Sequence, residues 1–129
     1  MIGYATVGCS DVPRGRVLYA AVFEIIGAQL VVDTETICVW QFDNHMFGIL
    51  RPSNGEPATF GNGTMIGIDA RDRARVRAVY QAALALGAKD EGAPTFRAPF
   101  PEGAVFSGYF RDFDGNKIAI FCSAREGDE

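Results

Sequence analysis

The strongest constraint on the fold of this chain is an internal repeat with a period of about sixty residues. Asp11 stands eight residues before Tyr19, and Asp72 stands eight residues before Tyr80. Each of these segments is followed by a Gly-Ala pair. Self-similarity at a fixed period indicates structural units that cannot bury their apolar faces alone and must pair. The repeat therefore predicts two copies of one supersecondary unit.

The sequence of each copy predicts the same order of helices and strands. An aspartate or serine can cap a helix N-terminus, apolar residues then recur at helical spacing, and a glycine ends each helix. Strands are predicted at 2–9, 29–33, 36–42, 46–51, 63–69, near 89–91, and on both sides of a turn at 112–116. We therefore predict an α+β fold of two paired βαβββ modules, at about 1–52 and 62–123, in a single domain followed by a charged tail at 124–129. The modules would form a curved eight-stranded mixed sheet around a cleft, with the helices outside.

The last predicted hairpin contains the most specific sequence motif of the chain. It runs from Gly108 to Cys122 and reads GYFRDFDGNKIAIFC. Gly115 supplies the positive φ that such a turn needs. The hairpin resembles the RDPDGN hairpin of the vicinal-oxygen-chelate superfamily, which includes glyoxalases, bleomycin-resistance proteins, fosfomycin-resistance proteins and extradiol dioxygenases. Phe113 stands in place of the proline of that motif. The resemblance extends over nearly the whole chain, with GNGTMIGIDARDRA as a second specific stretch, and it implies the same paired-module fold.

The resemblance also implies a metal site whose ligands this sequence lacks. Metal-dependent relatives commonly carry a histidine on the first strand, a histidine on the fifth and a glutamate on the eighth, which suit a divalent ion with open positions. The corresponding positions here hold Tyr4, Met65 and Ala119. A phenol binds divalent ions poorly unless it is deprotonated, a thioether prefers soft ions, and a methyl group binds none. We therefore expect neither a metal nor another cofactor.

The single histidine, His45, is predicted in a turn at 43–45, away from the cleft strands. A solvated turn residue is the expected role, rather than a ligand or general base. Cys9, Cys38 and Cys122 are odd in number and widely spaced in apolar surroundings, which favours buried free thiols. Free thiols in turn favour a reducing, cytoplasmic location.

Charge and hydropathy exclude several classes of partner. A net charge of −4 and a pI near 4.9 argue against a nucleic-acid partner. No apolar run approaches the length of a membrane span, and the N-terminus has no basic region typical of a signal peptide. We expect neither nucleic acid nor membrane as a partner.

Strand alternation predicts which side chains face the cleft, because every second residue of a strand points to the same side. An apolar, aromatic cavity with a few hydroxyls would suit a neutral or cationic organic ligand. The same side chains could instead fill the space as core. Resemblance to fosfomycin-resistance proteins draws attention to Tyr109, which stands at the offset of a substrate-contacting tyrosine. The predicted cleft residues are Tyr4, Thr6, Met65, Gly67, Ser107, Tyr109, Ala119 and Phe121.

Three functions are compatible with this sequence. The first is a metal-free protein that binds a small organic molecule, as in the bleomycin-resistance branch. The second is an enzyme of the lyase or dioxygenase type, similar to lactoylglutathione lyase, with unfamiliar ligands or a metal-free mechanism. The third is a structural or regulatory module with a filled cleft. A long loop around Phe96, Arg97 and Phe100 would be a lid or a subunit contact, and we expect a homodimer.

Overall fold

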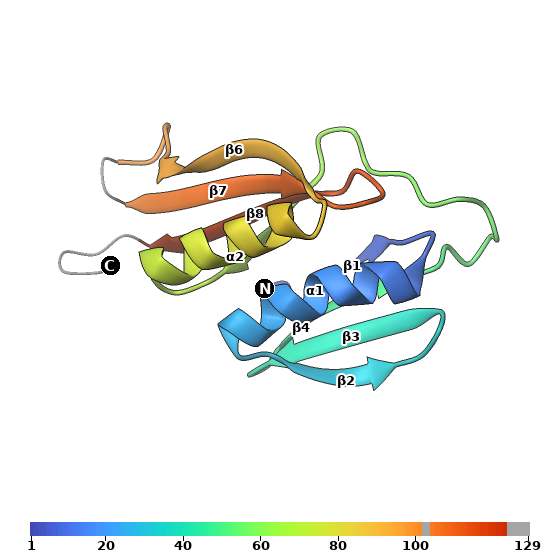
Figure 1. Cartoon of the computed structure of the whole chain (residues 1–129). Coiled ribbons are helices and arrows are strands. Elements are labelled where there is room, and N and C mark those ends of the chain that lie inside the picture. Colours follow the sequence, from blue (N-terminus) through green and yellow to red (C-terminus); the bar gives the residue numbers. More distant parts are fainter. Residues whose placement is uncertain (102–103, 124–129) are drawn as a thin grey trace.

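The computed structural model describes residues 1–101 and 104–123, and Figure 1 shows two modules with the same order of elements. The first module contains β1 (Tyr4–Gly8), α1 (Val12–Ile26), β2 (Gln29–Asp33), β3 (Ile37–Phe42) and β4 (His45–Leu50). The second contains β5 (Met65–Asp69), α2 (Arg73–Ala85), β6 (Lys89–Phe96), β7 (Val105–Arg111) and β8 (Lys117–Ser123). The predicted α+β class and the two βαβββ modules are confirmed. The predicted charged tail, 124–129, lies outside the described residues.

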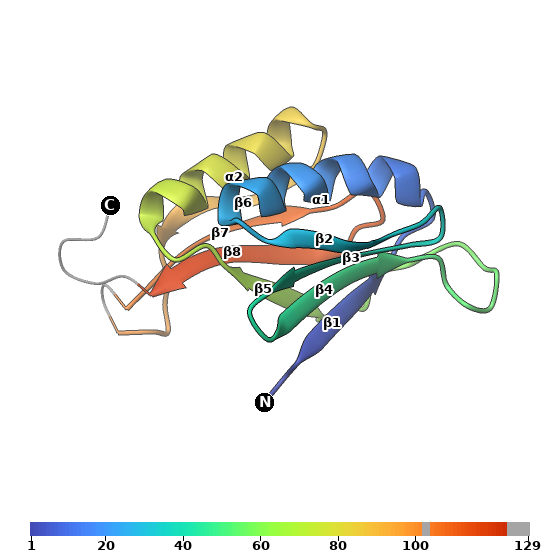
Figure 2. The same ribbon diagram turned by 90° about the horizontal axis from the view of Figure 1, so that it is seen from below.

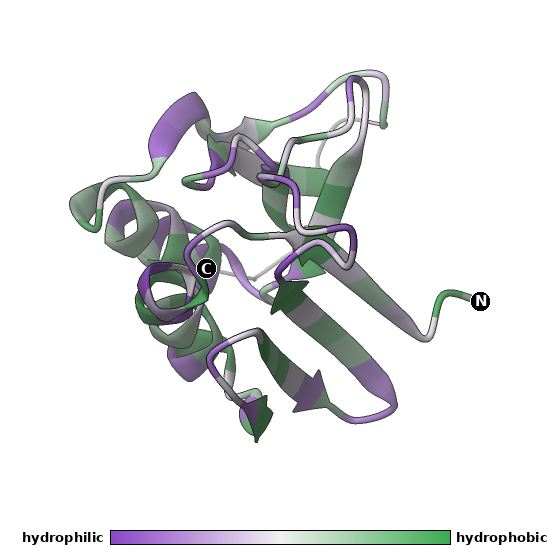
Figure 3. Cartoon of the chain, turned by 90° about the vertical axis from the view of Figure 1, so that its right-hand side faces the viewer, coloured by the Kyte–Doolittle hydropathy of each residue, from purple (hydrophilic) through white to green (hydrophobic). Residues whose placement is uncertain are grey.

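The eight strands form two four-stranded sheets, one in each module, with the orders β1-β4-β3-β2 and β5-β8-β7-β6. The first pair of each sheet is parallel and the other pairs are antiparallel, so both sheets are mixed. The two helices lie side by side on the same side of the strands (Figure 2), and the N-terminus lies on the other side (Figure 3). We call the sheet face away from the helices the open face; it carries Tyr4 and Thr6 of β1 and Met65 and Gly67 of β5.

The core lies between the helices and the sheets. Both predicted caps form: Asp11 Oδ1 accepts a hydrogen bond from the Arg14 N–H at 3.1 Å, and Asp72 Oδ1 accepts one from the Arg75 N–H at 2.8 Å. Gly27 ends α1 in the left-handed region, with a φ of 92°. The buried face of α1 meets the first sheet in a cluster of aromatic rings formed by Tyr19, Phe23, Trp40 and Phe47. Burial of each such ring stabilises the fold by about 2–3 kcal/mol.

Strand β6 is longer than the sequence predicts. A short strand near 89–91 followed by a long loop is expected, whereas β6 continues to Phe96. Its pairing with β7 is irregular on both sides of Gly92, and Pro94 lies within it. Because β6 is the edge strand of its sheet, the missing N–H of the proline costs no ladder hydrogen bond to a further strand. Glycine and proline therefore look like a loop in the sequence but are tolerated in this strand.

The turn between β7 and β8, which we call the closing turn (Asp112–Asn116), joins the two modules. Asp112 is 8% exposed, and its carboxylate accepts hydrogen bonds from the Tyr19 hydroxyl of α1 at 2.7 Å and from the Asn116 N–H at 2.9 Å. The side-chain amide of Asn116 donates to the Gly8 carbonyl oxygen at 2.9 Å. Two polar residues of the second module thus bind the end of β1 and the middle of α1, which fixes how the modules sit on each other.

The three cysteines are buried and free, as predicted. Among the described residues, no helix has the length and apolar character needed to cross a membrane.

Candidate functional site

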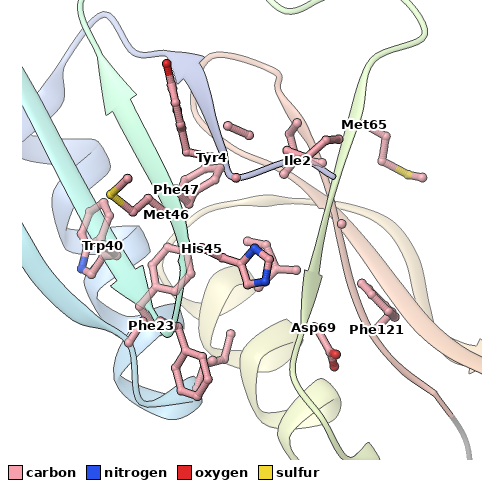
Figure 4. Close-up of a pocket in the computed structure, with 18 residues that line it drawn as sticks. Ile2, Tyr4, Phe23, Trp40, His45, Met46, Phe47, Met65, Asp69 and Phe121 are labelled. Atoms are coloured by element: carbon pink, nitrogen blue, oxygen red, sulfur yellow. The ribbon is translucent and has the colours of Figure 1, made fainter.

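A pocket of about 460 Å³ lies between the two modules, where β1 approaches β5 (Figure 4). We call it the inter-module pocket. Most of its lining is apolar, and aromatic rings from both modules contribute to it. Its walls include Phe23, Trp40 and Phe47 from the first module and Met65, Ile68 and Phe121 from the second.

The pocket exists because β1 and β5 are edge strands that are not hydrogen-bonded to each other. Small residues face the gap on both sides, with Gly3 and Ala5 on or next to β1 and Gly67 on β5. A side chain at Gly67 would meet the Phe121 ring, since an added Cβ would lie 3.3 Å from its Cε1 atom. The sequence therefore leaves open a space that larger side chains would fill.

Four of the predicted cleft residues line this pocket, namely Tyr4, Met65, Gly67 and Phe121. The other four, Thr6, Ser107, Tyr109 and Ala119, do not line it. The registers show that the predicted residues of the second module share one face: Gly67 pairs with Ala119, Ala119 pairs with Tyr109, and Ser107 pairs with Phe121. Ser107 and Ala119 are only 2% and 5% exposed, so little of either side chain is accessible to a ligand.

The positions of the expected metal ligands do not fit a metal ion. Tyr4 and Met65 are the first residues of β1 and β5, and they are 67% and 48% exposed. Neither a neutral phenol, a thioether nor the methyl group of Ala119 supplies the nitrogen or carboxylate donors that divalent ions need. Within residues 1–101 and 104–123, no three histidine, cysteine, aspartate or glutamate side chains converge on a possible metal site.

His45 lines the pocket, so the expectation of a position away from the cleft is wrong, whereas its side chain is exposed, as expected of a solvated residue. Phe42 pairs with His45, so the turn contains only residues 43 and 44, and β4 begins at His45. β4 lies beside the edge strand β1, and Figure 4 shows the imidazole between the two modules. Asp69, at the end of β5, lines the pocket on the side of the second module. The parallel pairing of β1 with β4 is the signal that would have placed His45 here.

A second group of polar side chains occupies the open face next to the pocket. Two cations lie close to the Tyr109 ring: the Arg97 guanidinium carbon is 4.7 Å and the Lys117 Nζ is 5.0 Å from its centroid. Arg111 forms a salt bridge with Glu91, which lowers the pKa of that carboxyl. Sequence reasoning assigned Arg97 to a lid or a subunit contact and gave Lys117 no role, because only the register brings both to Tyr109.

Comparison with known proteins relates the chain to a family. No protein-family model matches the chain, and no curated protein matches it in sequence. The chain is similar to the crystal structure of a glyoxalase/bleomycin resistance protein from Albidiferax ferrireducens T118, at 31% identity and a TM-score of 0.85 over 95% of this chain and 98% of that one.

More distant structures share the fold. A glyoxalase-related enzyme from Fulvimarina pelagi has 18% identity and a TM-score of 0.72, over 95% of this chain and 88% of that one. A lactoylglutathione lyase from Agrobacterium tumefaciens has 19% identity and a TM-score of 0.61, over 94% and 92%. Both similarities show the fold alone. The chain belongs to the glyoxalase/bleomycin resistance protein family, within the vicinal-oxygen-chelate superfamily, because it has the closing turn and the two modules and is 31% identical in sequence to the Albidiferax ferrireducens structure.

Proposed function

We propose that this protein is a metal-free binder of small organic molecules and that the inter-module pocket holds the apolar part of the ligand. The observation that carries the proposal is a pocket of about 460 Å³ with aromatic walls. Ligand sites are typically concave, mostly apolar and of about 300–1,000 Å³. An open space of this size supports a binding function over a structural module with a filled cleft.

The side chains at the expected metal-ligand positions support binding of a small molecule over metal-dependent catalysis. Tyr4, Met65 and Ala119 stand where the family resemblance implies metal ligands, and none of the three side chains replaces a histidine or carboxylate. We propose a homodimer, since Ile2, Tyr4 and Met65 expose apolar area on and beside the open face. We also propose a cytoplasmic location, since the three cysteines are free. The second candidate is a metal-free enzyme, which the position of His45 in the pocket favours.

Trp40 provides a direct test, because it is the only tryptophan of the chain and lines the pocket. The probe is 4-nitrobenzyl alcohol, a neutral nitroaromatic compound that quenches tryptophan emission at short range. We expect saturable quenching of Trp40, corrected for light absorption by the probe with a free tryptophan derivative. Isothermal titration calorimetry on the same sample gives the affinity, and light scattering gives the mass of the assembly.

The matched variants are Gly67→Val and Thr6→Val. A valine at 67 suits a strand but places new atoms against the Phe121 ring, so it should abolish saturable quenching. Thr6 is exposed on β1 outside the pocket, so its near-isosteric valine variant should bind as the wild type does. Equal quenching of both variants would contradict the proposal. So would stoichiometric metal, found by elemental analysis of protein purified without metal-affinity resin, on which probe binding depends.

A further inference from the structure

The cations around Tyr109 lie directly beside the inter-module pocket. Lys117 pairs with Met65 in the β5–β8 ladder, and Met65 is part of the pocket wall. Lys117 and Ala119 are two residues apart on β8, so their side chains point to the same face. Between the pocket and Tyr109 the sheet carries only Gly67 and Ala119 in one row. Ala119 is almost covered, so the cation that a ligand in the pocket can reach is Lys117, which lies one strand from the Met65 wall.

Arg97 is held in a fixed position over Tyr109. Its Nε donates to the Ser107 carbonyl oxygen at 3.0 Å, and its Nη2 donates to the Ala93 carbonyl oxygen at 2.5 Å. Gly92 makes this approach possible, because an added Cβ there would lie 3.1 Å from both Arg97 Nη2 and Tyr109 Cδ2. The two backbone acceptors leave Nη1 of the guanidinium available for a further acceptor.

Lys117 and Tyr109 also have donors to spare. Within the described ranges, neither the Lys117 ammonium nor the Tyr109 hydroxyl has a hydrogen-bond partner, and no carboxylate forms a salt bridge with Lys117 or Arg97. Both cations are half-buried. Arg111 differs, since it is bound to Glu91 and to the Gly115 carbonyl oxygen at 2.8 Å. The Glu91 carboxylate is near enough for the charge of Lys117 to help lower its pKa after the hydrogen bond from Arg111. That carboxylate is paired with Arg111, so Lys117 and Arg97 leave an excess of positive charge at the Tyr109 ring.

We propose that Lys117, Arg97 and Tyr109 form an oxyanion-binding site for the carboxylate or phosphate group of a ligand whose apolar body occupies the inter-module pocket. The inference rests on the proposed function for the apolar part of the ligand. It narrows the ligand to an amphiphilic organic anion, against the neutral or cationic ligand expected from the sequence. Charge-assisted hydrogen bonds to an oxyanion are about twice as strong as neutral ones. The positive charge of this site comes from side chains. Lys117 lies two residues from Ala119, which holds the position of an expected metal ligand.

The test uses three probes with the same nitrobenzyl body and different head groups: 4-nitrophenylacetate, 4-nitrobenzyl alcohol and 4-nitrobenzylamine. Quenching of Trp40 reports binding of each. We expect the anion to bind about tenfold more tightly than the alcohol, which corresponds to about 1.4 kcal/mol. The amine should bind most weakly. An amine or alcohol that binds as tightly as the anion would overturn the inference.

Lys117→Met is the diagnostic variant, and Lys89→Met is its control. These are the only two lysines of the chain, so both variants lose the same charge. Lys89 is exposed at the start of β6, whereas Lys117 lies over the Tyr109 ring. Lys117→Met should lose most of the preference for the anion over the alcohol, because only Arg97 and Tyr109 of the proposed site then remain. Lys89→Met should retain the preference. Equal behaviour of the two variants would refute the site.

Inorganic phosphate separates this inference from the proposed function. At constant ionic strength, phosphate should raise the melting temperature of the wild type and of Lys89→Met but not of Lys117→Met. That result supports the oxyanion site even if the alcohol fails to bind. Failure of the alcohol to bind would count against the proposed function and not against the oxyanion site. Saturable binding of the alcohol without any effect of Lys117→Met on phosphate or 4-nitrophenylacetate would instead sustain the pocket and reject the oxyanion site.

Discussion

The closing turn and the open face of β8 differ sharply in how they relate to the family, although Asn116 and Ala119 are only three residues apart. The turn retains the aspartates, glycine and asparagine of the family motif. The open face has lost every expected metal ligand. Asp112 and Asn116 of the turn are buried and hydrogen-bonded, whereas Tyr4 and Met65, which occupy two of the ligand positions, are exposed.

The physical reason for the difference lies in what each region contacts. Asp112 and Asn116 join the modules through their hydrogen bonds to Tyr19 and Gly8, and the other hydrogen bonds of the Asp112 carboxylate hold the turn itself, so the turn is needed whatever the ligand is. Phe113, the one departure in the turn, packs against α1, with the Arg14 guanidinium carbon 3.7 Å from its ring centroid. The side chains of Tyr4 and Met65 contribute little to the core, so their chemistry can change without cost to the fold. The sequence of the closing turn therefore identifies the fold, and the side chains of the open face determine the chemistry.

The largest effect on stability is expected from Asp112→Ala, which breaks the turn. The carboxylate accepts four hydrogen bonds, from the Tyr19 hydroxyl, the N–H groups of Asp114 and Asn116, and the Asn116 amide. Its removal leaves these donors without their acceptor in a buried place, so we expect a loss of about 3–5 kcal/mol in the free energy of unfolding. Urea denaturation measures the loss. Glu24→Ala, at an exposed position on α1, is the control and should change stability by less than about 0.5 kcal/mol. A loss below about 1 kcal/mol for Asp112→Ala would contradict this account of the turn.

A smaller loss, of about 1.5–3 kcal/mol, is expected from Tyr19→Phe, because it removes one hydrogen bond to a buried carboxylate. Tyr80→Phe is the matched variant, since Tyr80 holds the same place in the repeat and donates to Asp90 at 2.8 Å. That hydrogen bond lies at the surface, so its loss should cost less than about 1 kcal/mol. Equal losses for the two variants would mean that the joint between the modules does not depend on the Tyr19 hydroxyl.

At alkaline pH, the stability of Tyr19→Phe is predicted to differ from that of the wild type. Burial, and then the charge of Asp112, raises the pKa of Tyr19 well above its ordinary value. The folded state therefore favours the neutral phenol, and this stability is fully present below the unfolded pKa of about 10 and is lost as the pH rises above it. Burial also raises the pKa of the Cys9 thiol to about 12, which adds a loss from about pH 9 upward in every variant. Stability should therefore fall less steeply above about pH 10 in Tyr19→Phe than in the wild type.

Much of the fold was predictable because its signals are local or repeated. The caps Asp11 and Asp72, the helix-ending Gly27 and the turn glycine Gly115 each act on neighbouring residues, and the repeat then orders the elements. Strand β6 was predicted too short because the tolerance of an edge strand for Pro94 depends on strands that are distant in sequence. Local chemistry thus predicts the elements, and pairing decides their extent.

The site was less predictable for the same reason. Alternation correctly put Tyr109 and Ala119 on one face, but it could not show that Ala119 is almost covered or that the pocket lies between the sheet edges. His45 was missed because β4, which it begins, reaches the pocket through its pairing with β1, and Lys117 was missed because it pairs with Met65 of the distant strand β5. Residues whose position depends on inter-strand register carry no signal in their own neighbourhood.

The smallest effect on the fold is expected from changes on the open face. Tyr4→His with Met65→His should alter the free energy of unfolding by less than about 0.5 kcal/mol for each residue, because both side chains are exposed and lie outside the buried core. Neither variant alone nor the pair should bind a divalent ion tightly, since a site needs several nitrogen or oxygen ligands in near-ideal geometry. Ala119→Glu alone should also fail, and it carries the larger cost of placing a carboxylate at a position that is 5% exposed.

The triple variant, Tyr4→His with Met65→His and Ala119→Glu, should gain measurable binding of zinc ions by calorimetry while the closing turn stays intact. The control is the same triple change combined with Asp112→Ala, which should lose both stability and zinc binding, because the first histidine lies on one module and the other two ligands lie on the second. Zinc binding by the triple variant that is no tighter than that of the wild type would show that Tyr4, Met65 and Ala119 do not occupy the ligand positions of the family. Zinc binding that survives the loss of Asp112 would show instead that the turn does not set the relative position of the modules, which would remove the basis of the comparison between the two regions.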